Sequence, residues 1–361
     1  MQNKKIIAFY LPQFHSIPEN DEWWGKGFTE WSNTKKAKPL YRGHIQPKIP
    51  LKENYYNLLD EKVQLWQAKI AQKYGVYGFC YYHYWFNGKL LLEKPMENML
   101  NNLKINIPFC ISWANESWAR TWDGKEKNIL IQQKYEGETD WEAHINYLIP
   151  FFKDERYIKI NNKPVFLLYT ASRIENCEKM IKYWNERLQK EGFSGIYIIE
   201  TLNGLQHKSV LNSSSAEVIF EPIFSRTYDY KEQTILSKIK RYLRSNFGIG
   251  NVEKIDILKI YQLIENRKYN SNKKIYAGTF PSWDNTARKG KRGWVFFNGS
   301  PDTWKKHLGV MYKREDIGEF IFVNAWNEWG EGAYLEPDEI YKYSYLEKIR
   351  DLNDEAKVNK D

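Results

Sequence analysis

The stretch EFIFVNAWNEWGEG, residues 319–332, places an apolar run directly before two tryptophans, an asparagine and two glutamates. An apolar run of this length predicts a buried β-strand over residues 319–326. The polar residues after it then lie at the strand's C-terminal end, where α/β barrels carry their active sites. The fold of the whole chain therefore decides whether this stretch is a site or merely an acidic turn.

Seven more β-like runs precede this stretch. Most are continuous apolar runs, which are typical of parallel strands covered on both faces. The eight predicted strands cover residues 6–11, 76–85, 107–113, 164–170, 195–200, 217–221, 275–280 and 319–326.

Amphipathic segments follow these runs and predict helices over residues 60–75, 139–154, 175–192, 300–314 and about 339–353. Strands alternating with helices predict an α/β fold, a (β/α)8 TIM barrel, with a doubly wound open sheet as the alternative.

Two long βα-loop insertions interrupt the pattern. Residues 12–59 form an aromatic, proline-containing loop after the first strand, and residues 222–274 form a basic, largely helical insertion after the sixth. We predict one catalytic domain over residues 1–350 and a charged C-terminal tail over 351–361 that frays.

Aromatic residues make up 16% of the 361-residue chain, with 15 Trp, 26 Tyr and 18 Phe. Aromatic rings pack in cores, and they also stack on the apolar C–H faces of sugars. The composition therefore favours an oligo- or polysaccharide ligand.

The formal net charge is +9, part of it from Lys238, Lys240, Arg241 and Arg244. A solvated, lysine-rich surface explains this charge best, and an acidic glycan or a membrane surface explains it as well as nucleic acid does. We predict no nucleic-acid partner, and peripheral membrane contact stays open.

No targeting or metal-binding pattern stands out. Three cysteines without CxxC spacing (Cys80, Cys110 and Cys177) indicate neither a disulfide framework nor a metal cluster. The N-terminal apolar run is too short for a signal peptide and no run is long enough to span a membrane, so we predict a cytoplasmic protein. The chain has no HExxH, GxGxxG or P-loop motif, and we predict no metal and no cofactor.

Most predicted strand ends carry tryptophan together with an acid, amide or arginine. Such a set is what a sugar-binding cleft requires, although a buried structural role is an equal alternative for His83. The predicted substrate contacts are Gln13, His15, Trp23, Trp24, Glu30, Trp31, His83, Tyr84, Trp85, Trp113, Asn115, Glu116, Trp118, Arg120, Trp122, Asp123, Trp283, Asp284, Asn285, Arg288, Trp326, Asn327 and Trp329.

Glu328 and Glu331 are the predicted catalytic pair. Glycoside chemistry needs two carboxyl groups in different protonation states. If the segment turns helically, residues three apart have Cβ atoms roughly 5–6 Å apart. Carboxylates that close raise one pKa, as a general acid needs. The alternative is that Glu331 only caps the loop or forms a salt bridge there.

Five motifs in order, among them AFYLPQFHSIPENDEWWGKGFTEW, PFCISWANESWARTWDG and NAWNEWGEGAYLEPD, carry a family resemblance. Together they resemble the WbsX-like family, also described as glycoside-hydrolase-family-99-like, over about residues 5–348. The resemblance implies a (β/α)8 barrel. It also implies a role in surface-polysaccharide (O-antigen, lipopolysaccharide or capsule) metabolism, where members are often labelled glycosyltransferases.

The family 99 enzymes are endo-acting α-mannosidases with a motif similar to NEWxEG. In them the sugar's own 2-hydroxyl attacks the anomeric carbon and forms a 1,2-anhydro sugar. Carried over, the resemblance implies that Glu328 deprotonates this hydroxyl and that Glu331 acts first as acid and then as base. Gly330 departs from the pattern, since the mannosidases carry His there, so mannoside specificity does not transfer.

Three hypotheses follow. The first is an endo-acting glycoside hydrolase with a retaining, substrate-assisted mechanism. The second is a glycosyltransferase or transglycosylase of polysaccharide biosynthesis, although the chain has no Asp-x-Asp pair to hold the metal ion of a common nucleotide-sugar transferase. The third is a non-catalytic glycan-binding barrel.

Overall fold

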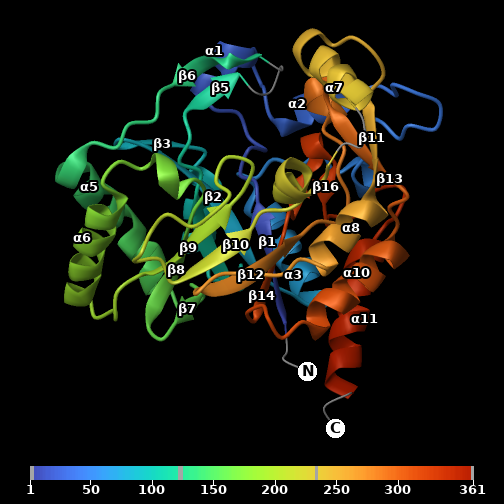
Figure 1. The fold of residues 1–361 in the computed structure, drawn as a ribbon. Helices are drawn as coiled ribbons and strands as arrows, with labels where there is room; N and C mark the ends of the chain where they lie inside the picture. Colours follow the sequence, from blue (N-terminus) through green and yellow to red (C-terminus); the bar gives the residue numbers. More distant parts are fainter. Residues whose placement is uncertain (1–3, 121–124, 232–234, 359–361) are drawn as a thin grey trace.

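Eight parallel strands close into a barrel in the computed structural model of the chain (Figure 1). The structure describes residues 4–120, 125–231 and 235–358, without the side chains of residues 120, 125–128, 235–238 and 245. The barrel strands are β1 (Lys5–Tyr10), β2 (Val76–Phe86), β4 (Phe109–Trp113), β8 (Lys163–Leu168), β9 (Tyr197–Leu202), β10 (Ala216–Ile219), β12 (Lys274–Thr279) and β14 (Phe320–Val323).

The strands follow one another around the barrel in chain order. Strand β1 pairs in parallel with β2 on one side and with β14 on the other, and this double pairing closes the sheet. The predicted (β/α)8 TIM barrel is confirmed, all eight predicted runs are strands, and the open-sheet alternative is wrong.

Aromatic rings fill the upper part of the barrel. The ring of Phe9 on β1 lies 5.5 Å from Tyr82, 5.2 Å from Phe220 and 5.6 Å from Phe322, measured between centroids. Rings of this size bury a large apolar area and fix one another by edge and face contacts. Tyr82 and Phe220 also line the cavity described below, so the core is continuous with the floor of the site.

Helices surround the barrel, as Figure 1 shows. They are α3 (Glu61–Lys73), α4 (Lys94–Asn101), α5 (Gly137–Lys153), α6 (Cys177–Lys190), α7 (Ile235–Phe247), α8 (Ile257–Glu265), α9 (Thr286–Lys289), α10 (Pro301–Lys313) and α11 (Ser344–Val358). In the part of the chain that the structure describes, no helix is long and apolar enough to cross a membrane.

The two insertions contain more regular structure than predicted. Residues 12–59 hold α1 (Pro18–Trp24), α2 (Glu30–Lys36) and a 3₁₀ turn, and residues 222–274 hold α7, α8 and β11 (Glu253–Asp256). The remaining short strands are β3 (Lys89–Leu91), β5 (Trp118–Arg120), β6 (Lys125–Ile131), β7 (Lys159–Ile160), β13 (Trp294–Phe297), β15 (Asn327–Glu328) and β16 (Ala333–Tyr334).

The connection between β9 and β10 has no helix in residues 203–215, which are all described. A buried carboxylate organises it instead. Glu200 accepts hydrogen bonds from the backbone nitrogens of Val210 and Leu211, at 2.8 and 3.2 Å. It also pairs with Lys273 at 3.2 Å. This connection of the barrel therefore lacks the helix that usually follows a strand.

The last helix begins and ends later than predicted. Asp338 accepts hydrogen bonds from the backbone nitrogens of Ile340 and Tyr341, at 2.9 and 2.5 Å. This Asx-type turn competes with a helix start at residue 339. Helix α11 then runs to Val358 and buries Leu352 and Ala356. Residues 351–358, predicted as part of a fraying tail, are therefore helical.

Candidate active site

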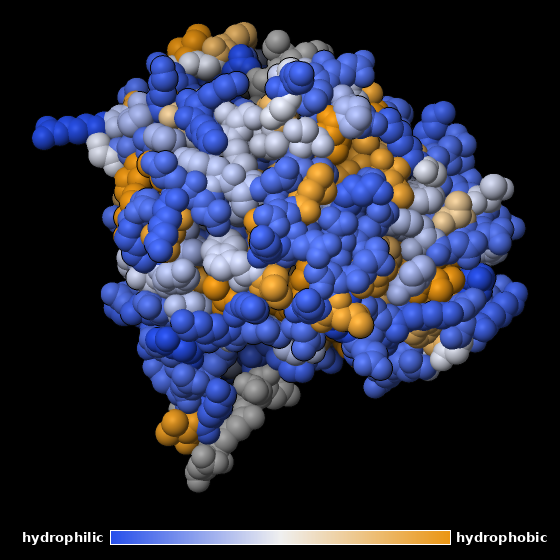
Figure 2. Space-filling view, turned by 180° about the vertical axis from the view of Figure 1, so that it is seen from behind, coloured by the Kyte–Doolittle hydropathy of each residue, from blue (hydrophilic) through white to orange (hydrophobic). Residues whose placement is uncertain are grey.

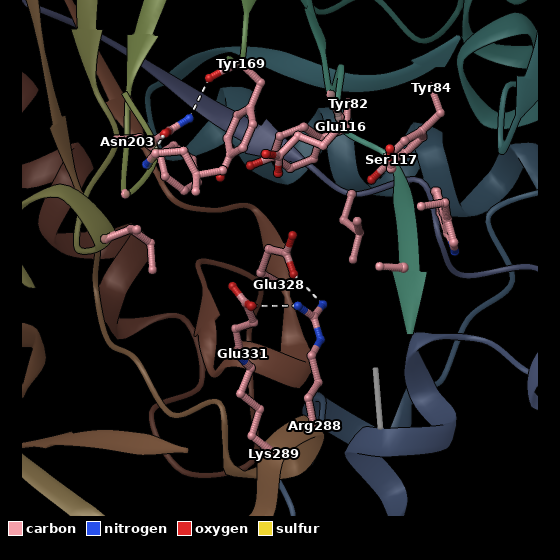
Figure 3. Close-up of a pocket in the computed structure, with 18 of the residues that line it drawn as sticks. Tyr82, Tyr84, Glu116, Ser117, Tyr169, Asn203, Arg288, Lys289, Glu328 and Glu331 are labelled. Carbon is pink, nitrogen blue, oxygen red and sulfur yellow. Dashed lines mark hydrogen bonds and ion pairs between the residues drawn. The ribbon is translucent and has the colours of Figure 1, made fainter. Parts of the chain in front are cut away.

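A cavity of about 570 Å³ opens at the C-terminal ends of the barrel strands (Figure 3). Seven of the predicted residues line it: Tyr84, Glu116, Trp118, Trp283, Arg288, Glu328 and Glu331. In Figure 3, Glu328 and Glu331 lie on one side of the cavity, and Tyr82, Glu116 and Tyr169 face them from the other.

The backbone around Glu328 is fixed to the first strand of the barrel. The side chain of Asn327 accepts a hydrogen bond from the backbone nitrogen of Leu11 at 2.8 Å and donates one to its carbonyl at 3.0 Å. Strand β15 pairs with β16, and a single 3₁₀ turn (Trp329–Glu331) between them sends both glutamates to the cavity. Gly332 ends the turn with a φ of 59°, in the left-handed region that favours glycine.

Arg288 binds three carboxylates at once. Its Nη2 lies 2.7 Å from Glu30 Oε1 and 2.7 Å from Glu328 Oε2, and its Nη1 lies 2.7 Å from Glu331 Oε1. Two nitrogens of one planar guanidinium therefore hold the two candidate catalytic groups, which fixes their relative positions.

Glu30 is the third carboxylate of this network. Its side chain is fully buried, and Oε1 accepts a hydrogen bond from the backbone nitrogen of Gly330 at 2.8 Å. A Cβ on residue 330 would lie 2.0 Å from Glu30 Oε1 and 2.9 Å from Arg288 Nε. Only glycine at position 330 therefore leaves room for Glu30 and Arg288 in these positions.

Three carboxyl groups share one positive charge, so the network favours retention of a proton. Burial raises the pKa of Glu328 to about 8, with Arg288 opposing the shift and Glu331 adding to it. Burial also raises the pKa of Glu30, again against the effect of Arg288. Glu328 thus holds a proton near neutral pH, while Glu331 is the more exposed of the pair, with 22% of its side chain accessible against 9%.

The side chain of Trp329, in the same turn, is held by a buried acid, Glu336. The ring of Trp329 stacks on Tyr334 at 3.8 Å and its Nε1 donates to Glu336 Oε2 at 2.7 Å. Tyr56 and Gln67 donate to the same carboxylate at 2.8 and 2.7 Å. Burial raises the pKa of Glu336 to about 7 despite these donors.

Asp284 fixes the loop that carries Arg288. It accepts hydrogen bonds from Gln46 Nε2 at 2.8 Å and lies 2.9 Å from His44 Nε2, while its backbone nitrogen donates to the carbonyl of Glu331 at 2.6 Å. Burial acts to raise the pKa of Asp284, but His44, Lys48 and Thr286 outweigh it and hold that pKa below its usual value. Asp284 therefore supports Glu331 and does not line the cavity.

Most of the other predicted contacts also lie away from the cavity surface, within the protein. For example, His83 Nε2 lies 2.9 Å from His144 Nε2, and Trp85 Nε1 donates to Asp140 at 2.8 Å. Thirteen of the predicted substrate contacts are buried and do not line this cavity: Gln13, His15, Glu30, Trp31, His83, Trp85, Trp113, Asn115, Asp284, Asn285, Trp326, Asn327 and Trp329.

Five further predicted residues lie at the edge of the site or outside the part of the chain that the structure describes. Trp23 and Trp24 lie on α1 and do not line the cavity, although Trp23 lies 6.4 Å from Trp118, which does. Trp122 and Asp123 are outside the described residues, and so is the side chain of Arg120.

Several residues that line the cavity were not predicted from the sequence, among them Tyr82, Ser117, Tyr169, Asn203 and Lys289. Tyr169 ends the fourth predicted strand and Asn203 follows β9, so position at a strand end was the signal that could have found them. Neither stands beside a tryptophan or an acid in the sequence, so the strand-end motifs did not indicate them.

A closed (β/α)8 barrel with two carboxylates, an arginine and aromatic rings at its strand ends is an architecture that carbohydrate-active enzymes use. The particular family follows from the sequence. The chain belongs to the family described as Glycosyltransferase WbsX, whose model matches residues 6–349.

Curated relatives match nearly the whole chain. The chain is 34% identical over 351 residues to the protein WxcX from each of two strains of Xanthomonas campestris pv. campestris, which covers 96% of this chain. The chain spans about half of the length of these relatives, 49% in each case.

Solved structures show the same fold. One is a glycoside hydrolase-like protein with a TM-score of 0.58 and 11% identity, covering 98% of this chain and 94% of that one. Another is the GH99 endo-alpha-mannosidase from Bacteroides thetaiotaomicron, with a TM-score of 0.52 and 12% identity, covering 100% of this chain and 99% of that one. At this identity the likeness concerns the barrel alone.

Within residues 4–120, 125–231 and 235–358, no group of three or more His, Cys, Asp or Glu side chains is arranged to hold a metal ion. Of the carboxylates that line the cavity, Glu328 and Glu331 pair with Arg288, and Glu116 pairs with Arg173.

Proposed function

We propose that the protein is an endo-acting glycoside hydrolase of bacterial surface-polysaccharide metabolism that uses Glu328 and Glu331. The observation that carries this proposal is the bridging of both carboxylates by Arg288 in a cavity walled by Tyr82, Tyr84 and Tyr169. A catalytic pair in an aromatic cleft is what cleavage of a glycosidic bond requires.

The proposed reaction is retaining and substrate-assisted. Glu328 takes the proton of the sugar's 2-hydroxyl as that oxygen bonds to the anomeric carbon, and Glu331 protonates the departing glycosidic oxygen. Glu331 then takes a proton from water, whose oxygen attacks the anomeric carbon and opens the 1,2-anhydro ring, and Glu328 returns its proton to the 2-oxygen. Each carboxyl group ends in the state in which it began.

The raised pKa of Glu328 gives this proposal a specific requirement. A base must be ionised, and burial keeps Glu328 protonated up to about pH 8 in the free protein. Arg288 stabilises the ionised form, so Glu328 acts as a base in the minor, deprotonated population at neutral pH. Glu331 must carry its proton at the same time, so activity is lost as pH rises above about 8 and the pair loses its last proton.

Sugar transfer is the second candidate function, favoured by the description of the matching family as a glycosyltransferase. The same pair of carboxyl groups serves transglycosylation when a sugar hydroxyl replaces water in the second step. A non-catalytic glycan-binding barrel is the third candidate, and it requires neither glutamate to be ionisable.

The deciding experiment incubates the protein with surface polysaccharide from its own source, with and without nucleotide sugars, and follows chain length by gel filtration. Shortening without a donor supports hydrolysis, whereas a product that forms only with a donor supports transfer. Glu328→Gln and Glu331→Gln should each lower the rate at least about 100-fold, as loss of a general acid or base does.

Glu315→Gln is the matched control. Glu315 is an exposed acid before β14, at the opposite end of the barrel, and its replacement should leave the rate unchanged. If binding persists while both site variants keep the wild-type behaviour, the protein is a glycan-binding barrel and the catalytic assignment is wrong.

A further inference from the structure

Helix α7 turns its apolar side chains outward. The exposed fractions are 50% for Ile239, 61% for Tyr242, 36% for Leu243 and 59% for Phe247. Residues three and four apart lie on one face of a helix, so these four side chains form a single stripe. Ile249, just beyond the helix, adds a fifth exposed apolar side chain, at 59%.

The side of α7 that faces the protein is held by an arginine. Arg244 is only 8% exposed and forms an ion pair with Glu253 of β11, which also pairs with Arg226. A surface helix ordinarily does the reverse and packs its apolar stripe on the core. In the described part of the chain, the stripe therefore faces outward from a helix that is anchored by charge.

The surroundings of the stripe are basic. Residues 233–252 contain Lys238, Lys240, Arg241 and Arg244 and no Asp or Glu. Helix α7 packs on the 3₁₀ turn Gly290–Arg292, within residues 286–293 (TARKGKRG), which also carry four Lys or Arg and no acid. An apolar stripe with cationic borders is complementary to an anionic lipid surface.

A second copy of the chain fits this face less well. A twofold dimer through α7 brings the same patch on both subunits together. The basic residues of one copy then oppose those of the other, which disfavours association. The charge thus selects a lipid surface over self-association.

The helix also lies at the mouth of the site. The turn on which it packs directly follows Arg288 and Lys289, which line the cavity. Figure 1 places α7 at the same end of the molecule as α1, β5 and β6. Figure 2, viewed from behind, shows a group of apolar residues protruding at that end.

We propose that α7 is a membrane-docking helix that seats the mouth of the cleft on an anionic bilayer. In this arrangement the stripe enters the headgroup region, and Lys240, at its border, meets the lipid phosphates. This inference goes beyond the proposed function and does not depend on it, because it concerns a surface that contains no catalytic group.

Vesicle flotation tests the proposal. Wild-type protein should float with vesicles of phosphatidylethanolamine and phosphatidylglycerol (3:1) and stay in solution with phosphatidylcholine vesicles. Lys240→Glu should weaken binding at least about fivefold, the effect of one basic residue near an anionic surface. Ile239→Ser/Phe247→Ser should weaken it at least about tenfold.

Val310→Ser is the control, since Val310 is 42% exposed on α10 and lies outside this patch. Its vesicle binding should match the wild type. Because the replaced side chains of α7 are already exposed, both variants should keep the wild-type melting temperature.

Two results would overturn the proposal. One is absence of flotation with the anionic vesicles, or flotation that the α7 variants leave unchanged. The other is a lipid-free dimer in sedimentation velocity that Ile239→Ser/Phe247→Ser converts to a monomer, which assigns the stripe to a second copy of the chain.

Discussion

Glu30 Oε1 occupies the space that a side chain at position 330 would fill. It lies 2.8 Å from the backbone nitrogen of Gly330 and 2.0 Å from where a Cβ on that residue would stand. Glu30 and a larger residue at position 330 are therefore mutually exclusive. This relationship gives a physical reason why the chain has glycine where the resembling mannosidases carry histidine.

Gly330→Ala should displace Glu30 and, with it, Arg288. We expect a loss of about 2–4 kcal/mol in the free energy of unfolding, because a close-packed buried network must shift. In a Glu30→Ala background only Arg288 Nε, at 2.9 Å, still lies close to the added Cβ, and the same substitution should cost less than in the wild type. Urea unfolding of the four proteins of this double-mutant cycle measures the coupling.

Gly309→Ala provides the control for that cycle. Its added Cβ meets only Leu352 Cδ2 at 3.6 Å, an ordinary contact, and the residue lies inside α10. The substitution should be neutral or slightly stabilising. Equal costs of Gly330→Ala in both backgrounds would contradict the steric argument.

Arg288→Met should be strongly destabilising, by about 3–5 kcal/mol, because it leaves buried carboxylates without their cation. Adding Glu30→Gln should recover part of this loss, since one of the unpaired acids is then neutral. Chemical unfolding at pH 7 gives both values. A variant with the stability of the wild type would show that Arg288 is not the electrostatic centre of the site.

The rate of glycan cleavage should fall as pH rises above about 8. Burial raises the pKa of Glu328 to about 8, and the proposed reaction needs one proton on the pair, because Glu328 must be ionised while Glu331 is protonated. The measurement is kcat/KM between pH 5.5 and 9, with Glu315→Gln as a control that keeps the profile. A rate that keeps rising above pH 8 would contradict the requirement for a protonated acid.

Glu336 should make the protein less stable as pH rises. Burial raises its pKa from 4.5 to about 7, so the folded state binds this proton more tightly than the unfolded state does. The resulting stabilisation is fully present below pH 4.5 and is lost as pH rises through about 7, a change of about 3 kcal/mol. Unfolding of wild type and Glu336→Gln from pH 4.5 to 8 should show this difference.

Glu200→Gln tests a group whose contribution to stability changes with pH in the opposite direction. Burial acts to raise the pKa of Glu200, but hydrogen bonds from Ser209 and Ser214 and the charge of Lys273 hold it below its usual value. Its stabilisation is present above the unfolded pKa and is lost as pH falls. Parallel pH profiles for the two variants would contradict both assignments.

The sequence predicted the barrel well because each strand is a local apolar run that pattern analysis detects. Glu328 and Glu331 stand in one turn, so their spacing alone indicated a pair. The partners of that pair were harder to assign, since Glu30 and Gly330 are 300 residues apart and only barrel closure brings them together. Many of the tryptophans and histidines predicted as substrate contacts, such as Trp113 and His83, are buried. A sequence does not show which side of a strand end faces the core.

The pairing of β1 with β14 has a further consequence for biosynthesis. Glu30 follows the first strand, and Arg288 and Glu328 flank the last, so the ion network joins the first and last strands of the barrel. A nascent chain on the ribosome has no Glu328 to complete the network until the last barrel strand has been made. The network of Glu30, Arg288, Glu328 and Glu331 is therefore assembled late in synthesis of the barrel.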